Sequence, residues 1–262
     1  MKVTNRKAGF TLVELLVVIG ILGILSAALY PAITSAVMSA QMTAVGARGR
    51  DIFVGITAAN TEREPLGLGP IWPRTQAPQG TGGSSNPDIT EMPFNDAVKY
   101  FQELYDEKNV QNQAQWNPYV VGFDYSKLAG AGVKTPTGQT LQPENCMWCI
   151  GANVRDEIED IIPILVTRNV NCSQLATKYE GQNRTLVGLG TPGSAEFDTP
   201  FGSKAFVIVQ KGGGIHKASG KYSRLDVIYK GQRFDLNVQG GGGNIQPFTY
   251  LTPRGSQAPS GS

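Results

Sequence analysis

The residues best suited to redox or metal chemistry in this sequence are its three cysteines. Cys146 and Cys149 have the Cys-x-x-Cys spacing of redox and metal sites, and Cys172 follows downstream. A structural zinc site needs four ligands, and only Cys172 and His216 are left to complete one. A thioredoxin-like motif should open a helix after a strand, which the flanking residues do not suggest. We therefore expect one disulfide bridge, either within the Cys146 and Cys149 pair or from one of them to Cys172, with buried free thiols and a metal or redox site as alternatives.

Acidic residues around Ile158 form a second pattern that could recruit an ion. Four carboxylates lie within five positions, at Asp156, Glu157, Glu159 and Asp160. The spacing lacks the alternating oxygen ligands of a calcium loop. The pattern therefore favours a solvated acidic helical turn, and calcium binding is the alternative.

A glycine run and a lone histidine complete the candidates for chemistry. Gly212-Gly213-Gly214 lacks the Lys-Ser or Lys-Thr pair and the following helix of a phosphate-binding loop, so it predicts a flexible hairpin loop. His216 is the only histidine and has no recognisable nucleophile partner. The sequence therefore does not predict an enzyme.

One carboxylate, Glu14, stands inside an apolar run. From Leu15 to Ala47 the chain holds no Asp, Glu, Lys or Arg, and about 20 apolar residues suffice to cross a bilayer core as a helix. An ionised carboxylate in hydrocarbon costs several kcal/mol unless it is paired. The α-amino group of Phe10 on a neighbouring copy, once released by cleavage, would be a suitable partner. That pairing would drive self-assembly.

The residues before the run form a short basic leader. Lys2, Arg6 and Lys7 carry positive charge without any acid, which holds this flank on the cytoplasmic side of a membrane. In a secretory signal the small residue of the cleavage site follows the apolar region. Here Gly9 precedes it, so cleavage after Gly9 would leave the helix on the mature protein. An ordinary signal anchor needs neither this glycine nor Glu14.

The stretch Lys7-Ala8-Gly9-Phe10-Thr11-Leu12-Val13-Glu14, followed by Gly23 and Pro31, closely resembles the class III leader and first helix of type IV pilins and type II secretion pseudopilins. The motif covers about the first tenth of the chain. It supports the class and leaves the subfamily open.

The resemblance implies how the chain is processed and assembled. A membrane-embedded aspartic prepilin peptidase would cut between Gly9 and Phe10 and methylate the new N-terminus of Phe10. Glu14 would be the assembly carboxylate, and Gly23 and Pro31 would loosen or kink the helix. The partners implied are other copies of the chain, other minor pilins, and an inner-membrane assembly platform with its ATPase.

The rest of the chain predicts an α+β fold, in which a long N-terminal helix packs on a C-terminal antiparallel sheet. After Pro31 the helical pattern becomes one-sided from Met38 to Ala59, as expected of a helix that covers a sheet. It should end between Asn60 and Glu64, since Pro65 disfavours helix in the residue before it. We divide the chain into a leader (1–9), a membrane-spanning and filament-core helix (10–33), the amphipathic half of that helix (34–64), a loop-rich head (65–239) and a flexible Gly-rich tail (240–262).

Local patterns predict the elements of the head. Pro, Gly and Ser predict a surface loop from Pro65 to Pro93, and Asn95 is expected to cap a helix over residues 96–107. An aromatic cluster over residues 116–125 is interpreted as core or loop packing, with sugar binding as the alternative. The strands are expected at Ile161 to Val166, Ala205 to Val209, Leu225 to Tyr229 and Phe234 to Val238, the first as an edge or irregular strand because of Pro163 and the last two joined as a hairpin.

Composition bears on the fold of the head and on the expected partners. Glycine (32 residues) and proline (16 residues) are abundant, which favours turns and a β-rich head. Removing the leader removes three of the 23 Lys and Arg residues and leaves 20 against 21 Asp and Glu, so the net charge gives no argument for a nucleic-acid partner.

We expect an inner-membrane protein with a cytoplasmic N-terminus and a periplasmic or extracellular head. It would be a structural subunit of a type II secretion pseudopilus, or alternatively of a type IV pilus for adhesion, motility or DNA uptake, or a ligand-binding subunit at a filament tip.

Overall fold

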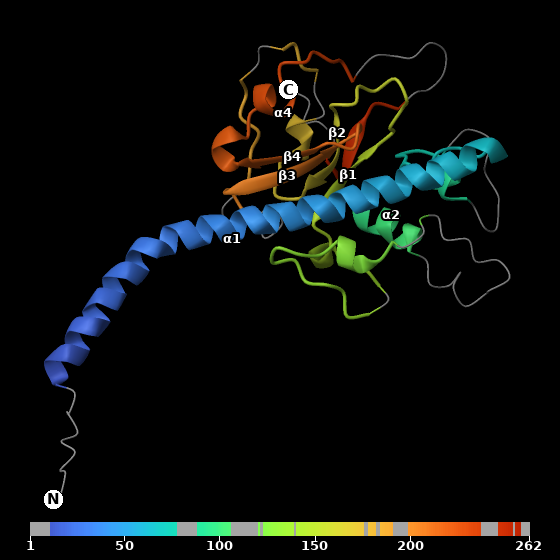
Figure 1. The fold of residues 1–262 in the computed structure, drawn as a ribbon. Helices are drawn as coiled ribbons and strands as arrows, with labels where there is room; N and C mark the ends of the chain where they lie inside the picture. Colours follow the sequence, from blue (N-terminus) through green and yellow to red (C-terminus); the bar gives the residue numbers. More distant parts are fainter. Residues whose placement is uncertain are drawn as a thin grey trace, which may run out of the picture. The chain divides into compact units, whose positions relative to one another are not determined.

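The computed structural model describes residues 11–77, 88–105, 120, 123–138, 140–175, 178–181, 184–190, 199–236, 246–253 and 255–257. The chain divides into two compact units, Met1–Gln41 and Met42–Ser262. The helix α1 (Leu12–Arg63) supplies the described part of the first unit and continues into the second (Figure 1).

The two halves of α1 differ in burial, as their sequences predict. From Leu12 to Val37 the large apolar side chains are exposed. From Val45 onward one stripe of the helix is buried, and it consists of Val45, Gly46, Gly49, Ile52, Phe53, Ile56 and Ala59. The helix ends at Arg63, followed by a 3-10 turn over Glu64–Leu66 and by Gly67 in the left-handed conformation (φ 69°).

The second unit is built on one antiparallel sheet. Its strands are β1 (Trp148–Ala152), β2 (Pro163–Thr167), β3 (Ala205–Gln210), β4 (Ile215–Ser219), β5 (Thr249–Thr252) and β6 (Gly255–Gln257). Their order across the sheet is β4-β3-β2-β1-β5-β6, and every neighbouring pair is antiparallel. The long helix and this sheet confirm the predicted α+β class.

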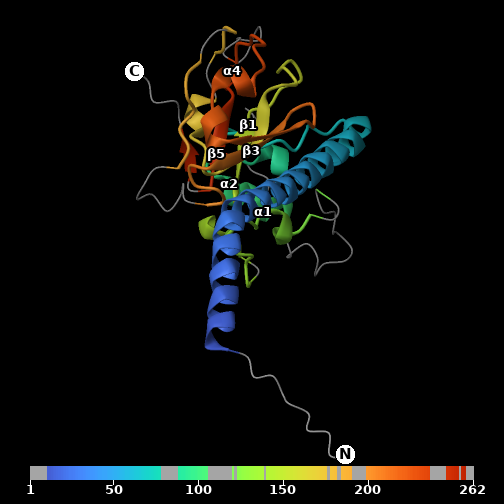
Figure 2. The same cartoon turned by 60° about the vertical axis from the view of Figure 1, so that its left-hand side comes forward.

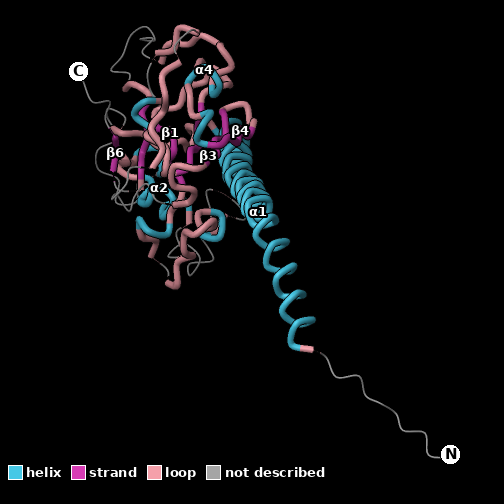
Figure 3. The backbone as a smooth tube through the Cα atoms, turned by 90° about the vertical axis from the view of Figure 1, so that its left-hand side faces the viewer, coloured by secondary structure: helices cyan, strands magenta, loops and turns pink. Residues whose placement is uncertain are grey.

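The sheet is covered on both faces. On one face the head half of α1 lies beside β3 and β4 (Figure 3), and Gly46 and Gly49 allow its backbone to approach Ile215 and Trp148. On the other face Phe206 and Ile208 of β3 join a buried cluster with Tyr179 and Tyr229. Figure 2 shows the short helix α4 (Leu225–Ile228) on this second side.

Short helices connect these layers. The helix α2 (Ala97–Leu104) lies within the range predicted for it, but Asp96 caps it in place of Asn95, since the Asp96 Oδ1 accepts the Lys99 N–H at 2.7 Å. The remaining described helices are single 3-10 turns at Ile89–Glu91, Tyr125–Lys127, Pro143–Asn145, Cys172–Gln174 and Gly220–Tyr222. Residues 78–87 of the predicted surface loop lie outside the described residues.

Two of the predicted strands need correction. Leu225 to Tyr229 forms α4, because its buried residues recur at helical spacing and the Tyr229 N–H reaches the Leu225 carbonyl at 2.9 Å. The predicted hairpin is therefore absent. Phe234 forms an isolated bridge with Tyr179, and residues 237 and 238 lie outside the described residues.

β2, predicted to be an edge or irregular strand because of Pro163, lies inside the sheet and is irregular at this residue. Pro163 is its first residue, and the pairing with β3 is irregular between Pro163 and Leu165, so the missing N–H is tolerated there. β3 confirms the strand predicted at Ala205 to Val209.

Part of the predicted flexible tail belongs to the sheet. β5 pairs with β1, and Tyr250 and Leu251 in it are fully buried. The apolar residues of this short segment therefore find cover in the core. Residues 240–245 and 258–262 of the tail lie outside the described residues.

Candidate functional site

The start of α1 holds the carboxylate that the sequence singles out. Two groups of Thr11 donate to Glu14 Oε2: the backbone N–H at 2.9 Å and the hydroxyl Oγ1 at 2.7 Å. In return, the Glu14 N–H donates to Thr11 Oγ1 at 3.3 Å. This reciprocal pattern is a capping box, which satisfies donors that a helix start otherwise leaves open. Thr11 therefore fixes the position of the Glu14 carboxylate.

The capping box leaves part of the carboxylate for another partner. Both Thr11 donors reach the same oxygen, Oε2, and neither uses Oε1. Around Glu14 the helix presents only apolar surface, with Leu12 81% and Leu15 58% exposed. A cation approaching from another molecule would thus meet a carboxylate that is already oriented, in apolar surroundings where the attraction between charges is strong.

The two helix-loosening positions lie within continuous helix. α1 is unbroken from Leu12 to Arg63, so the local unwinding expected near Pro31 is absent. The hydroxyls of Thr34 and Ser35 donate to the carbonyls of Pro31 and Ala32, at 2.9 Å each. Nothing lies within 4 Å of where a Cβ on Gly23 would stand. The kink itself stays a prediction.

Gly9 and Phe10, the predicted cleavage site, lie outside the described residues, so the site is judged from its sequence. Residues 4–30 match the prokaryotic N-terminal methylation motif. The match spans the leader from Thr4, the Gly9 to Phe10 bond and Glu14. It is consistent with the class III prepilin leader of type IV pilin-like proteins, a family whose members are structural.

The match is confined to the N-terminal segment. No curated protein and no solved structure matches the chain. The head is therefore interpreted from its own geometry. α1 is the one described helix that is long and apolar enough to cross a membrane, by length and composition.

The three cysteines are separate buried thiols in the structure. Cys146 Sγ donates to the Trp148 carbonyl and Cys172 Sγ to the Val170 carbonyl, both at 3.4 Å. Cys149 and Cys172 belong to the core cluster beneath the sheet, whereas Cys146 does not. Burial raises the pKa of the Cys146 thiol to about 12. The cysteines thus correspond to the free-thiol alternative in this structure, and the predicted disulfide is not formed in it.

The acidic segment forms turns and not a helix. Asp156, Glu157, Glu159 and Asp160 are exposed around the buried Ile158. Lys211 Nζ donates to the Asp156 and Ile158 carbonyls at 2.6 Å each, and these bonds hold the segment against the end of β3. Within the described ranges no three His, Cys, Asp or Glu side chains are placed to hold a metal ion.

The glycine run forms the hairpin between β3 and β4, as predicted, and the Gln210 N–H donates to the Gly214 carbonyl at 2.8 Å. His216 follows it on β4. Its ring lies 5.9 Å from that of Phe206, and its buried Nε2 has no hydrogen-bond partner among the residues described. Burial, together with the Lys230 charge, lowers the pKa of His216.

The described members of the aromatic cluster are buried. Phe123 stacks on Phe101 with ring centroids 6.0 Å apart, and Tyr125 lies 4.4 Å from Tyr105. Trp116 and Tyr119 lie outside the described residues. Core packing therefore accounts for the described part of this cluster.

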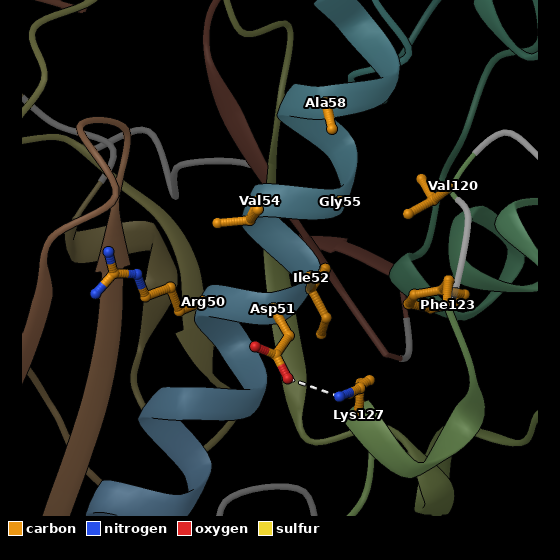
Figure 4. A pocket seen from close by; sticks show the side chains of 9 residues that line it. All are labelled: Arg50, Asp51, Ile52, Val54, Gly55, Ala58, Val120, Phe123 and Lys127. Carbon is orange, nitrogen blue, oxygen red and sulfur yellow. Dashed lines mark hydrogen bonds and ion pairs between the residues drawn. The ribbon is translucent and has the colours of Figure 1, made fainter.

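A groove of about 440 Å³ runs between α1 and the segment that carries Phe123 (Figure 4). Its walls are mainly apolar and include Ile52, Gly55 and Val120. At one end the Lys127 Nζ pairs with Asp51 Oδ2 at 2.6 Å. The ion pair and the tight approach of Val120 to Gly55 tie this segment to the helix.

Two features of the site and head were missed by the sequence analysis. The capping box could have been predicted from the sequence, because Thr11 and Glu14 have the Thr-x-x-Glu spacing before an apolar run. Arg168 had no local signal. The residue is 9% exposed, and its guanidinium donates to the carbonyls of Pro143, Cys146 and Thr199, which ties three segments together.

Proposed function

We propose that this chain is a structural subunit of a type II secretion pseudopilus or of a related type IV pilus-like filament. One observation carries the proposal. A methylation motif matches residues 4–30, and from Leu12 to Val37 the helix exposes apolar side chains, with Glu14 in its first turn as the only acid of this stretch. A soluble enzyme has no use for such an arrangement, whereas a filament core made of these helices would bury them.

The precursor is held in the bacterial inner membrane by α1, with the basic leader in the cytoplasm and the head on the opposite side. Prepilin peptidase cuts between Gly9 and Phe10 and the new amine is methylated. An assembly platform and its ATPase then extract the subunit. In the filament, apolar helix surfaces that faced lipid pack against one another.

Glu14 sets the position of each incoming subunit. The amine of Phe10 on one copy pairs with Glu14 on the next, and the Thr11 hydroxyl holds the carboxylate so that Oε1 faces its partner. A carboxylate and an ammonium group attract each other far more strongly in an apolar core than in water. A subunit out of position would leave both charges buried and unpaired.

Two variants test this mechanism in cells that carry the rest of the system. Glu14→Ala should be cleaved normally and fail to assemble, while Gly9→Leu should remain uncleaved because a larger side chain crowds the scissile bond. Immunoblots follow leader removal, and sedimentation of sheared material follows assembly. Normal filaments from Glu14→Ala would refute the pairing, whatever the outcome for Gly9→Leu.

The secretion pseudopilus is preferred over the pilus on a single local feature. The run Leu22-Gly23-Ile24-Leu25 before Pro31 resembles pseudopilins slightly more than pilins. Deletion of the gene discriminates the two functions. Loss of exoprotein secretion without loss of surface filaments supports the pseudopilus, and loss of filaments seen by electron microscopy supports the pilus.

A further inference from the structure

The two ends of the head sheet carry opposite charge. At the end where β3 begins, three lysines gather: Lys204 just before β3, Lys217 on β4, and Lys221 just after β4. Pairing holds them together, because Ala205 lies opposite Ser219 and the Gly220 N–H donates to the Lys204 carbonyl at 2.7 Å. All three side chains are exposed.

These lysines have no acidic partner. In the part of the chain that the structure describes, none of the three lies within ion-pair distance of a carboxylate. Lys217 Nζ makes one hydrogen bond, to the Thr43 hydroxyl at 3.0 Å. Among the described residues, these three positive charges therefore have no carboxylate that pairs with them.

The opposite end carries the exposed acidic turn. The Gly212 N–H donates to the Asp160 carbonyl and the Lys211 N–H to the Ile162 carbonyl, at 2.9 Å each, so the turn sits where β3 ends. Its four carboxylates, at Asp156, Glu157, Glu159 and Asp160, are exposed. Two cations lie nearby, Arg155 and Lys211, and the turn remains negative overall. At about 3.3 Å per residue, the two ends are roughly 25 Å apart along β3.

The direction from the basic end of the sheet to its acidic end follows the part of α1 that packs on the sheet. Thr43 contacts Lys217, Gly46 lies against Ile215 one turn further, and Phe53 lies against Gly213 beyond that. The strand β4 thus runs antiparallel to α1, and β3 runs parallel to α1. The basic end of the sheet lies beside the first turns of α1 that pack on the sheet, and the acidic end lies beside later turns of the same helix (Figure 1).

We propose that the basic end of one head docks on the acidic end of a second copy, head to tail along the helix direction. The inference rests on the proposed filament. A contact between two different patches of the same chain does not close on itself and continues from copy to copy, as a filament requires. Opposite charges at the two patches select this register over others and disfavour contacts between like ends.

Charge reversal with rescue tests the contact in the full chain, expressed with the rest of its assembly system. Lys204→Glu with Lys221→Glu, and separately Glu157→Lys with Asp160→Lys, should each lower the sedimented filament fraction at least about tenfold, because like charges then meet. The quadruple variant restores opposite charges and should recover most of the wild-type fraction. Lys99→Glu with Lys134→Glu is the matched control at exposed sites away from both ends and should assemble normally.

A second measurement reads the contact directly. A carbodiimide, which joins a lysine amine to a carboxylate without a spacer, should couple Lys204 or Lys221 to Glu157 or Asp160 in wild-type filaments. The ends are too far apart within one head for this product to form inside a single copy.

The outcomes separate this contact from the filament proposal. Wild-type filaments with no such cross-link and no rescue would overturn the contact while leaving the subunit function intact. Lysine variants that fail without rescue would also overturn it, and would point to anionic lipid or to protection of the β4 edge as the role of these lysines. A wild-type chain that is never cleaved or assembled would instead overturn the proposed function.

Discussion

The packing of α1 on the sheet depends on Gly49, and its replacement by alanine gives a quantitative test. A Cβ at this position would stand 2.6 Å from Trp148 Cη2, 2.8 Å from Trp148 Cζ2 and 2.9 Å from Val209 Cγ2. Trp148 is fully buried, and its indole N–H donates to the Lys127 carbonyl at 3.1 Å, so the ring cannot simply rotate away.

The magnitude follows from two opposing terms. Alanine favours helix over glycine by about 1 kcal/mol. Overpacking against a fixed ring costs about 1–3 kcal/mol. Gly49→Ala should therefore lower the free energy of unfolding by about 1 kcal/mol, or about 2–4 °C in Tm for a unit of this size. Gly46→Ala is the matched comparison, since its Cβ would stand 2.9 Å from Ile215 Cγ2 and 3.6 Å from Val207 Cγ1, and Ile215 is only half-buried on the edge strand β4, where it can shift. At Gly46 the gain in helix propensity and the cost of overpacking should nearly cancel.

Chemical denaturation of the detergent-solubilised protein, followed by tryptophan fluorescence, measures both variants under the same conditions. A Gly49→Ala variant as stable as the wild type, or more stable, would refute the close approach of helix and sheet. Equal destabilisation by both alanines would show that backbone strain and not the Trp148 contact is responsible.

Three further predictions concern the head. Arg168→Met should lower the free energy of unfolding by about 2–4 kcal/mol, because it removes the guanidinium that donates to the carbonyls of Cys146 and Thr199 and shares the Pro143 carbonyl with the Cys146 N–H. Arg168→Lys should recover less than half of this loss, and full recovery by lysine would contradict the three-carbonyl arrangement. The pKa of His216 is lowered in the folded head, so below pH 6.5 the unfolded chain takes up the proton first, and stability should fall as the pH drops from 6.5 towards the folded pKa. His216→Phe should flatten that dependence in denaturation curves recorded between pH 7.5 and 5, and an unchanged slope would exclude this histidine as its source. All three cysteines should resist alkylation in the native protein and react after unfolding without reductant; a single alkylated cysteine by mass spectrometry would show that a disulfide has formed.

The helix and the exposed apolar surface of its first half could be predicted because their signals are local, and the role of Glu14 stays a prediction. A charge-free apolar run, a spacing of three and four residues after Pro31, and a glycine before the run each occur within one segment. The β-branched run at Ala205 to Val209 likewise formed the expected strand.

The failures occurred where local pattern permits two structures. Leu225 to Tyr229 has apolar residues that fit a strand or a helical turn, and burial of Leu225 and Ile228 on one side decides for the turn. β5 was taken for part of a mobile tail because its flanks are rich in glycine and polar residues, yet pairing with β1 orders it. The buried charge of Arg168 is satisfied by carbonyls from distant segments, which no local pattern can reveal.

The most direct test of the filament account is the intact mass and N-terminal sequence of the mature protein, isolated from cells that contain prepilin peptidase. The account predicts a chain that has lost Met1 to Gly9, begins at Phe10 and carries one added methyl group on its N-terminal amine. A mature chain that keeps its leader, or one cut on the far side of the apolar helix so that Glu14 is lost, would contradict it.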